Sequence, residues 1–312
     1  MPTTPNPGTT DLGQRLLESI ETVVLGKRDA IERTLTALIG GGHVLIEDVP
    51  GVGKTLLARA LARSLGLPFQ RLQCTADLLP ADVLGAPVYD PATGSIELRE
   101  GPVFTSVLIA DELNRTPPRT QSALLECMAE GCVTIDGQTR NLPESFFVVA
   151  TQNPTTSAGT YPLPDSQLDR FLVRVSLGYP ALDDELIVVA REDGHRSLES
   201  LEPVASEQDL VVAREQVRGI RVQEDVLRYL VEFVRATRTH SEVEVGVSPR
   251  GAQALHRACR ARAFLQNREY VLPDDIQELA VPVLGHRVGV DGGIDAASAL
   301  IHELLQQTAA PA

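Results

Sequence analysis

Residues 51–55, with the sequence Gly-Val-Gly-Lys-Thr, constrain this chain more than any other segment. They follow the apolar run 43–46 and open a segment whose apolar residues recur at helical spacing. Glycines here let backbone N–H groups face phosphate oxygens, a lysine reaches the outer phosphates, and a hydroxyl binds Mg²⁺ at the start of the helix. The sequence therefore predicts a loop that binds ATP and Mg²⁺. The expected contact residues are Pro50, Gly51, Val52, Gly53, Lys54, Thr55 and Leu56.

The loop departs from the full phosphate-binding pattern at Asp48, where a glycine is expected. Aspartate tolerates left-handed backbone better than most residues, so the loop can keep its shape. A carboxylate near the phosphates leaves the affinity for ATP open.

Polar residues follow two further apolar runs. Asp111 and Glu112 come after the run 107–110, and Asn153 comes after the run 146–150. Ligands of open α/β sheets gather at the carboxyl ends of the strands. We therefore expect Asp111 to hold Mg²⁺ with Thr55, Glu112 to orient or deprotonate the attacking water, and Asn153 to contact the γ-phosphate or position water. Taken alone, these residues would be a solvated loop and a turn before a proline.

Two arginines are candidates for contacts to the γ-phosphate. Arg170 precedes an apolar run, and it is either an arginine finger or the partner of Asp169 or another nearby carboxylate in an ion pair. Arg250 falls at the second position of a helix that we expect to begin at Ser248, where a cation opposes the helix dipole at a cost of about 0.3–1 kcal/mol. An anion such as the γ-phosphate would offset that conflict, and the alternative is a solvated arginine.

The order of the elements predicts an α/β domain with a parallel sheet, followed by a helical domain. The expected strands are short apolar runs at 43–46, 107–110, 146–150 and 171–175, and helical patterns cover 222–238, 249 onward, 273–284 and 294–306. We place a disordered tail at 1–10, the α/β domain at 11–180 and the helical domain at 181–312. Two insertions, 88–98 and 132–140, are expected to be hairpins outside the main sheet, and Asp136-Gly137 favours a two-residue turn.

Composition limits the partners. The chain has 28 basic and 42 acidic side chains, a net charge of −14, no tryptophan and 4% aromatic residues. An acidic chain with few aromatics is a poor nucleic-acid binder, and no run approaches the ~18 apolar residues of a membrane helix. The four cysteines have neither metal-ligand nor disulfide spacing, which favours unpaired thiols and a cytoplasmic protein.

These motifs together resemble the MoxR group of AAA+ ATPases, in the helix-2-insert clade. The resemblance covers almost the whole chain beyond the first ten or so residues. The stretches that carry it are Ile46-Glu-Asp-Val-Pro-Gly-Val-Gly-Lys-Thr55, Asp111-Glu-Leu-Asn-Arg-Thr-Pro-Pro-Arg-Thr-Gln-Ser-Ala-Leu-Leu-Glu126, Ala150-Thr-Gln-Asn-Pro154, Leu163-Pro-Asp-Ser-Gln-Leu-Asp-Arg-Phe171 and Ser248-Pro-Arg250.

The resemblance implies an AAA+ core with a helical lid, assembled into a ring, as a hexamer, with ATP sites between subunits. It implies that Asn153 is sensor 1, Arg250 is sensor 2, and Arg170 is a finger that reaches a neighbour. It also places Val24 and Gly26 beside adenine and turns the hairpins toward the ring pore. Such proteins remodel or mature protein clients, often with a von Willebrand factor A domain partner.

Two other functions stay open at this point. One is a subunit of a metal chelatase or nucleic-acid motor of related architecture, which the acidic charge and missing aromatics make less favourable. The other is an interaction module that binds ATP without turnover, against which Glu112 and Arg170 argue.

Overall fold

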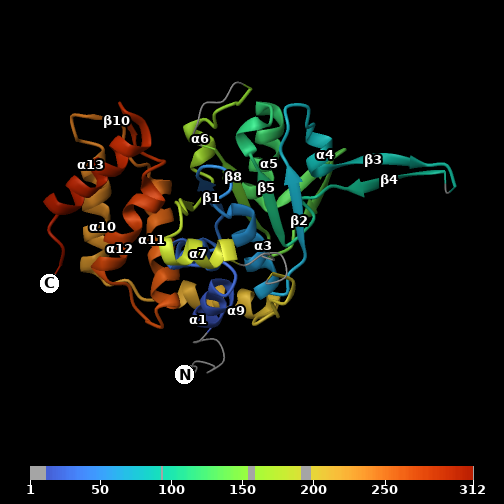
Figure 1. The fold of residues 1–312 in the computed structure, drawn as a ribbon. Helices are drawn as coiled ribbons and strands as arrows, with labels where there is room; N and C mark the ends of the chain where they lie inside the picture. Colours follow the sequence, from blue (N-terminus) through green and yellow to red (C-terminus); the bar gives the residue numbers. More distant parts are fainter. Residues whose placement is uncertain (1–11, 93, 154–158, 191–197, 312) are drawn as a thin grey trace, which may run out of the picture.

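A five-stranded parallel sheet forms the centre of the protein (Figure 1). The computed structural model describes residues 12–92, 94–153, 159–190 and 198–311, so the tail predicted at 1–10 lies outside the described residues. The strand order is β2-β5-β8-β1-β9. The bounds of these strands are β1 Val44–Glu47, β2 Phe69–Gln73, β5 Val107–Asp111, β8 Phe147–Gln152 and β9 Val173–Val175. Four of them match the predicted apolar runs, and β2 is the strand that the sequence did not indicate.

Alternating side chains of the sheet enter two separate cores, as the two-residue period of a strand requires. In β1, Val44 and Ile46 belong to one core and Leu45 to the other. In β5, Ile109 joins the first core and Leu108 the second. Both faces of the sheet are therefore covered, which explains why its strands are continuous apolar runs.

The first core is covered by helices from both ends of the chain (Figure 1). The helices α1 and α2 precede the sheet, and both pack against α11. The bounds are α1 Leu12–Glu21, α2 Arg28–Ile39, α3 Lys54–Ser64, α4 Pro80–Leu84, α5 Pro118–Glu130, α6 Asp165–Leu168 and α7 Leu182–Ala190, with a 3₁₀ turn, η1, at Leu113–Arg115. The second core lies under α4 and α5.

The C-terminal part is helical, as predicted, with a short two-stranded sheet added to it. Its helices are α9 Glu207–Gly219, α10 Glu224–Thr237, α11 Pro249–Leu265, α12 Pro273–Leu284 and α13 Gly293–Gln307, and its strands are β10 Val243–Val245 and β11 Gly289–Val290. Ser248 caps α11 as expected, because its Oγ accepts the Gly251 amide at 3.1 Å.

Both predicted hairpins are present and lie outside the main sheet. The hairpin of β3 (Gly85–Asp90) and β4 (Ser95–Glu100) projects away from the sheet, on the side opposite α13 in Figure 1. The hairpin of β6 (Cys132–Ile135) and β7 (Gln138–Asn141) turns at Asp136-Gly137, where φ is 49° and 75°. Positive φ at both positions is the two-residue turn that the Asp-Gly pair indicated.

The four cysteines are unpaired, and Cys74, Cys127 and Cys259 are buried. Burial raises the pKa of the Cys74 thiol to about 11 and that of Cys127 to about 12, so both thiols stay protonated and unreactive near neutral pH. Within the described ranges, no helix has the length and apolar character that a bilayer crossing requires.

Candidate active site

The loop between β1 and α3 has the backbone that phosphate binding requires. Gly51 and Gly53 have φ of 88° and 98°, and Gly53 is the left-handed N-cap of α3. A Cβ added at either glycine would meet no atom within 4 Å, so the glycines are needed for conformation and leave open space beside the backbone. This space, at a helix N-terminus, fits a phosphate chain.

The ammonium group of Lys54 lies at the ends of two strands. Nζ donates to the Asp48 carbonyl, to Asn153 Oδ1 at 2.9 Å and to the Gln152 carbonyl at 3.3 Å. Burial lowers the pKa of Lys54, and the nearby carboxylates of Asp48 and Glu112 act in the opposite direction. The Lys54 ammonium group is thus bound by uncharged oxygens, and phosphate oxygens can take the place of these partners.

Thr55 and Asp111 lie together as the predicted metal ligands. Thr55 Oγ1 is 3.2 Å from Asp111 Oδ1, and Thr151 Oγ1 is 3.3 Å from the same oxygen. A hydroxyl and a carboxylate suit Mg²⁺, which binds few protein oxygens and takes the rest from water and phosphates. The donor set therefore fits the ion. Arg71 on β2 already pairs with Asp111, with Nε 2.6 Å from Oδ2.

Glu112 is fixed in an uncommon backbone conformation beside these ligands. Its φ and ψ are 59° and 48°, the left-handed region that non-glycine residues seldom occupy. Its amide donates to Thr151 Oγ1 at 3.0 Å. Its carboxylate lies 3.2 Å from Asn153 Nδ2 and 3.1 Å from Arg115 Nε. Asn153 therefore connects Lys54 to Glu112 through the two ends of its amide.

Asp48 turns away from the space for the phosphates. Its carboxylate accepts hydrogen bonds from the amides of Val49, Leu177 and Gly178 and from the Ser176 hydroxyl. Burial alone would raise the pKa of Asp48, but these donors hold it below its usual value. The described non-glycine residues with positive φ do not include Asp48. Asp48 therefore does not adopt the left-handed backbone that an aspartate in place of the usual glycine suggested.

Val24 and Gly26, the residues expected beside adenine, lie next to the segment that follows β9. Val24 is buried, and Gly26 has φ of 65°. A Cβ on Gly26 would lie 1.9 Å from Asp184 Oδ2 at the start of α7. Lys27 donates to the Tyr179 carbonyl at 2.7 Å. The segment that follows β9 thus touches the loop of Val24 and Gly26 on one side and Asp48 on the other.

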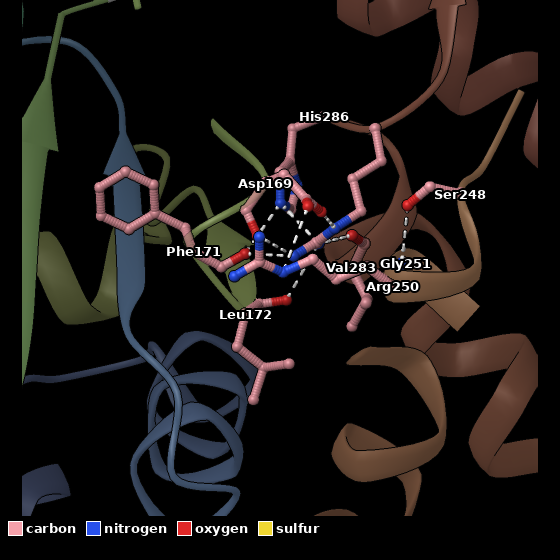
Figure 2. A network of polar contacts seen from close by, with 9 residues as sticks. Asp169, Phe171, Leu172, Ser248, Arg250, Gly251, Val283 and His286 are labelled. Atoms are coloured by element: carbon pink, nitrogen blue, oxygen red, sulfur yellow. Dashed lines mark hydrogen bonds and ion pairs between the residues drawn. The ribbon is translucent and has the colours of Figure 1, made fainter. Parts of the chain in front are cut away.

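Arg170 and Arg250 form a second group that lines one pocket, and Figure 2 shows Arg250 beside Asp169, the neighbour of Arg170 in the chain. Arg250 Nε lies 3.7 Å from Asp169 Oδ2, next in the chain to Arg170. Asp169 pairs with Arg250 and Arg287, and among the described residues the Arg170 side chain has no such partner. The ion pair between Asp169 and Arg170 that the sequence allowed is therefore not present.

The two arginines border a pocket of about 280 Å³. Its described lining includes four arginines and one carboxylate: Arg170, Arg250, Arg257, Arg287 and Asp169. Gly41, Gly42 and His43, which precede β1, complete that side. A pocket with this excess of guanidinium groups favours an anion.

Sequence reasoning missed several contacts of the site. Arg71 went unnoticed because β2 was not expected, and Phe69–Gln73 shows only weak alternation. Thr151 directly follows the predicted strand 146–150, where its hydroxyl carried no separate signal. Arg287 is 118 residues from Asp169 in the chain, so no local pattern indicates their contact.

Comparison with known proteins agrees with this arrangement. Residues 43–173 match the family described as ATPase family associated with various cellular activities (AAA), and residues 235–303 match the AAA lid domain. The protein YeaC of Bacillus subtilis, which is uncharacterised, is 50% identical over 274 residues, covering 88% of this chain and 86% of that protein. Chaperone MoxR1 of Mycobacterium tuberculosis is 37% identical over 284 residues, covering 88% and 75%.

A solved structure extends the likeness to the fold. The crystal structure of an ATPase candidate from Cytophaga hutchinsonii superposes with a TM-score of 0.87 at 36% identity, covering 97% of this chain and 96% of that one. Sequence, lid and fold agree over most of the chain. The protein therefore belongs to the MoxR group of AAA+ ATPases.

Proposed function

We propose that this protein hydrolyses ATP with Mg²⁺, at sites that two neighbouring copies build together. Lys54, Thr55, Asp111, Glu112 and Asn153 supply one half of the site. Arg170 and Arg250 supply the other half to the neighbour. The observation that carries this proposal is that the two groups lie at opposite edges of the same parallel sheet.

The register of the sheet supports the separation between Lys54 and Arg170 of the same chain. Lys54 follows the carboxyl end of β1, whereas the Leu172 amide bonds to the carbonyl of His43 before β1 begins. Four strand residues span about 13 Å. Arg170, before Leu172, therefore belongs to the opposite edge from the phosphate loop of its own chain. A neighbour in a ring brings the two edges together.

Each residue then has a defined task. The open backbone at Gly51 and Gly53 binds the phosphates, and Lys54 exchanges its carbonyl partners for phosphate oxygens. Thr55 and Asp111 would hold Mg²⁺, which neutralises charge on the phosphates when it is bound. Glu112, oriented by Asn153 and Arg115, accepts a proton from the attacking water. Arg170 and Arg250 of the neighbour face charge that develops on the γ-phosphate.

We extend the proposal to a hexameric ring in the cytoplasm that remodels protein clients with a von Willebrand factor A domain partner. The likeness to a protein named chaperone MoxR1 supports the chaperone role. The exposed apolar side chains of the β3–β4 hairpin, Val88, Tyr89 and Ile96, suit contact with a protein. Unpaired cysteines suit a reducing compartment.

Steady-state phosphate release tests the hydrolysis. We expect Lys54→Ala and Glu112→Gln to lower turnover by at least about 10²-fold, since both act on the reacting phosphate or water. Arg228→Ala is a matched control, because Arg228 is a solvent-exposed arginine on α10. Equal activity in the wild type and both site variants would refute the proposal.

Complementation between copies tests the shared site. Arg170→Ala chains keep an intact phosphate loop, and Glu112→Gln chains keep an intact Arg170. Mixing them should restore part of the turnover, whereas each alone stays inactive. A monomer by light scattering, with and without ATP, would contradict the ring.

A further inference from the structure

Arg287 is a buried arginine in the turn after α12, and it binds the segment that carries Arg170. Figure 2 labels Asp169, Phe171 and Leu172 of that segment. Its side chain is 4% exposed. Nε donates to Asp169 Oδ1 at 2.6 Å, and Nη2 donates to the carbonyls of Asp169 at 2.9 Å and Phe171 at 2.7 Å. Nη1 lies 3.4 Å from the Leu172 carbonyl. One guanidinium group thus binds the backbone on both sides of Arg170.

The same guanidinium group is joined to the helical part of the protein. Nη1 donates to the Val283 carbonyl in the last turn of α12 and lies 2.7 Å from His286 Nε2. Burial first, and then the charge of Arg287, hold the pKa of His286 well below its usual value, so the ring stays neutral beside the guanidinium group. Arg287 therefore moves with α12.

Asp169 extends this network to the second arginine. Its Oδ1 binds Arg287, and its Oδ2 lies 3.7 Å from Arg250 Nε at the start of α11. A buried guanidinium group without its carboxylate is strongly destabilised, so the pair with Asp169 is maintained. Arg170 is thus attached to Arg287 through its backbone, and Arg250 lies within ion-pair distance of the same network through Asp169.

We propose that Arg287 is a positioning residue for ATP hydrolysis, which holds Arg170 and Arg250 in the geometry that the neighbour's phosphates require. The inference rests on the proposed function. It adds that the two arginines form one unit with α11 and α12. A rotation of the helical part would therefore move both arginines together, relative to the neighbour's phosphate loop.

Replacement of Arg287 gives the first test. In Arg287→Met, the side chain keeps its apolar stem and loses every donor. We expect kcat to fall by about 10²-fold, because a displacement of about 1 Å has that effect on a reacting geometry. The KM for ATP should stay within about twofold, since the chain's own phosphate loop is untouched. Arg287→Lys keeps a charge beside Asp169 and should recover part of kcat.

Mixed assemblies separate positioning from simple damage. Arg287→Met chains retain their phosphate loop, and Lys54→Ala chains retain intact arginines. Mixing them should give turnover well above the sum of the two, because a Lys54→Ala neighbour can serve the loop of an Arg287→Met chain. Mixing Arg287→Met with Arg170→Ala should give no recovery of turnover, since both variants are impaired in the half of the ATP site that contains the arginines.

Thermal melting of each variant shows whether it folds. If Arg287→Met does not fold, Arg287→Lys, which keeps a charge beside Asp169 but lacks the several donors that bind the backbone around Arg170, replaces it in the same mixtures. The same recovery is expected, and its absence overturns the inference.

The outcomes distinguish the positioning role of Arg287 from the proposed hydrolysis of ATP, on which it rests. An inactive wild type would refute the proposed hydrolysis, and this inference with it. An active wild type with impaired Arg170→Ala and fully active Arg287→Met would overturn the inference alone. Impaired Arg287→Met that Lys54→Ala chains do not rescue would also overturn it.

Discussion

The carboxylate of Asp48 accepts a hydrogen bond from the Gly178 amide at 2.6 Å, and this contact ties the phosphate loop to the segment after β9. The Ser176 hydroxyl and the Leu177 amide donate to the same oxygen. The carboxylate that departs from the usual loop sequence therefore has a structural role outside the phosphate space.

We expect Asp48→Ala to lower the free energy of unfolding by about 2–4 kcal/mol, because one buried donor and three partly buried donors lose a charged acceptor. Affinity for ATP should fall rather than rise, since the loop loses its attachment to residues 176–178. Denaturant unfolding and equilibrium titration with a fluorescent ATP analogue measure the two effects. Asp77→Ala, at an exposed aspartate, is the control and should leave both unchanged. Tighter ATP binding by Asp48→Ala would contradict this role.

The proposed Mg²⁺ ion would compete with Arg71 for Asp111. Arg71 Nε lies 2.6 Å from Asp111 Oδ2, and the arginine side chain is 54% exposed. An exposed ion pair contributes about 0.2–1 kcal/mol, which corresponds to about 1.4- to 5-fold in affinity. Arg71→Ala should therefore lower the Mg²⁺ concentration for half-maximal turnover by that factor. Magnesium titrations at saturating ATP measure it, and a rise in the requirement would show that Arg71 assists the ion.

Asn153 connects Lys54 to Glu112, so its loss should affect turnover more than binding. We expect Asn153→Ala to lower kcat by about 10²-fold with little change in ATP affinity, because the contact orients Glu112, the proposed general base. Kinetics and equilibrium binding separate the two. Asn141→Ala, at an exposed position of β7, is the matched control. A large loss of affinity with kcat unchanged would assign Asn153 to ground-state binding.

Acid should destabilise the fold through His43. Burial, with help from Arg214 and Arg257, lowers its pKa from 6.5 to about 4, while the Met128 carbonyl acts in the opposite direction. Above pH 6.5, the folded and unfolded states are both neutral at this residue. Below pH 6.5, His43 binds a proton in the unfolded state but stays neutral in the folded state down to about pH 4. The free energy of unfolding therefore falls as the pH falls from 6.5 to 4.

The loss from His43 is about 1.4 kcal/mol per pH unit at most, or about 2 kcal/mol between pH 6.5 and 5. His43 donates to the Met128 carbonyl and accepts from the Val148 amide, and a glutamine amide has both capacities. His43→Gln should therefore flatten the dependence. Urea unfolding from pH 7.5 to 5 measures the slope, and an unchanged slope in the variant would exclude His43 as its source.

Local features of the fold were predictable from the sequence because they depend on neighbouring residues. The helix at Pro273–Leu284 has the predicted bounds, since proline suits its first position and acidic residues its first turn. The Asp136-Gly137 turn and the Ser248 cap follow from the same kind of local preference. The loop at 51–55 was equally clear, since its glycines, lysine and threonine are consecutive.

Features that depend on distant contacts were not predictable. Strand β2 lies at the edge of the sheet and buries only Leu72, so its polar residues conceal it. The sequence placed Arg250 with the γ-phosphate but could not assign it to an edge of the molecule. Its place beside Asp169 depends on how α11 packs against α2, which no sequence pattern encodes. The residue assignments at the site remain predictions for the variants above to test.

The core that α1 and α2 share with α11 and α12 bears on how the chain can be divided. Leu16 and Leu35 from the N-terminal helices belong to the same buried cluster as Leu255 and Ile276 from the C-terminal ones. A fragment that ends at residue 180 would expose Leu16 and Leu35 to water. The fragment that begins at residue 181 would expose Leu255 and Ile276. Neither half is a natural unit for expression, and heating the intact protein should melt both in a single transition.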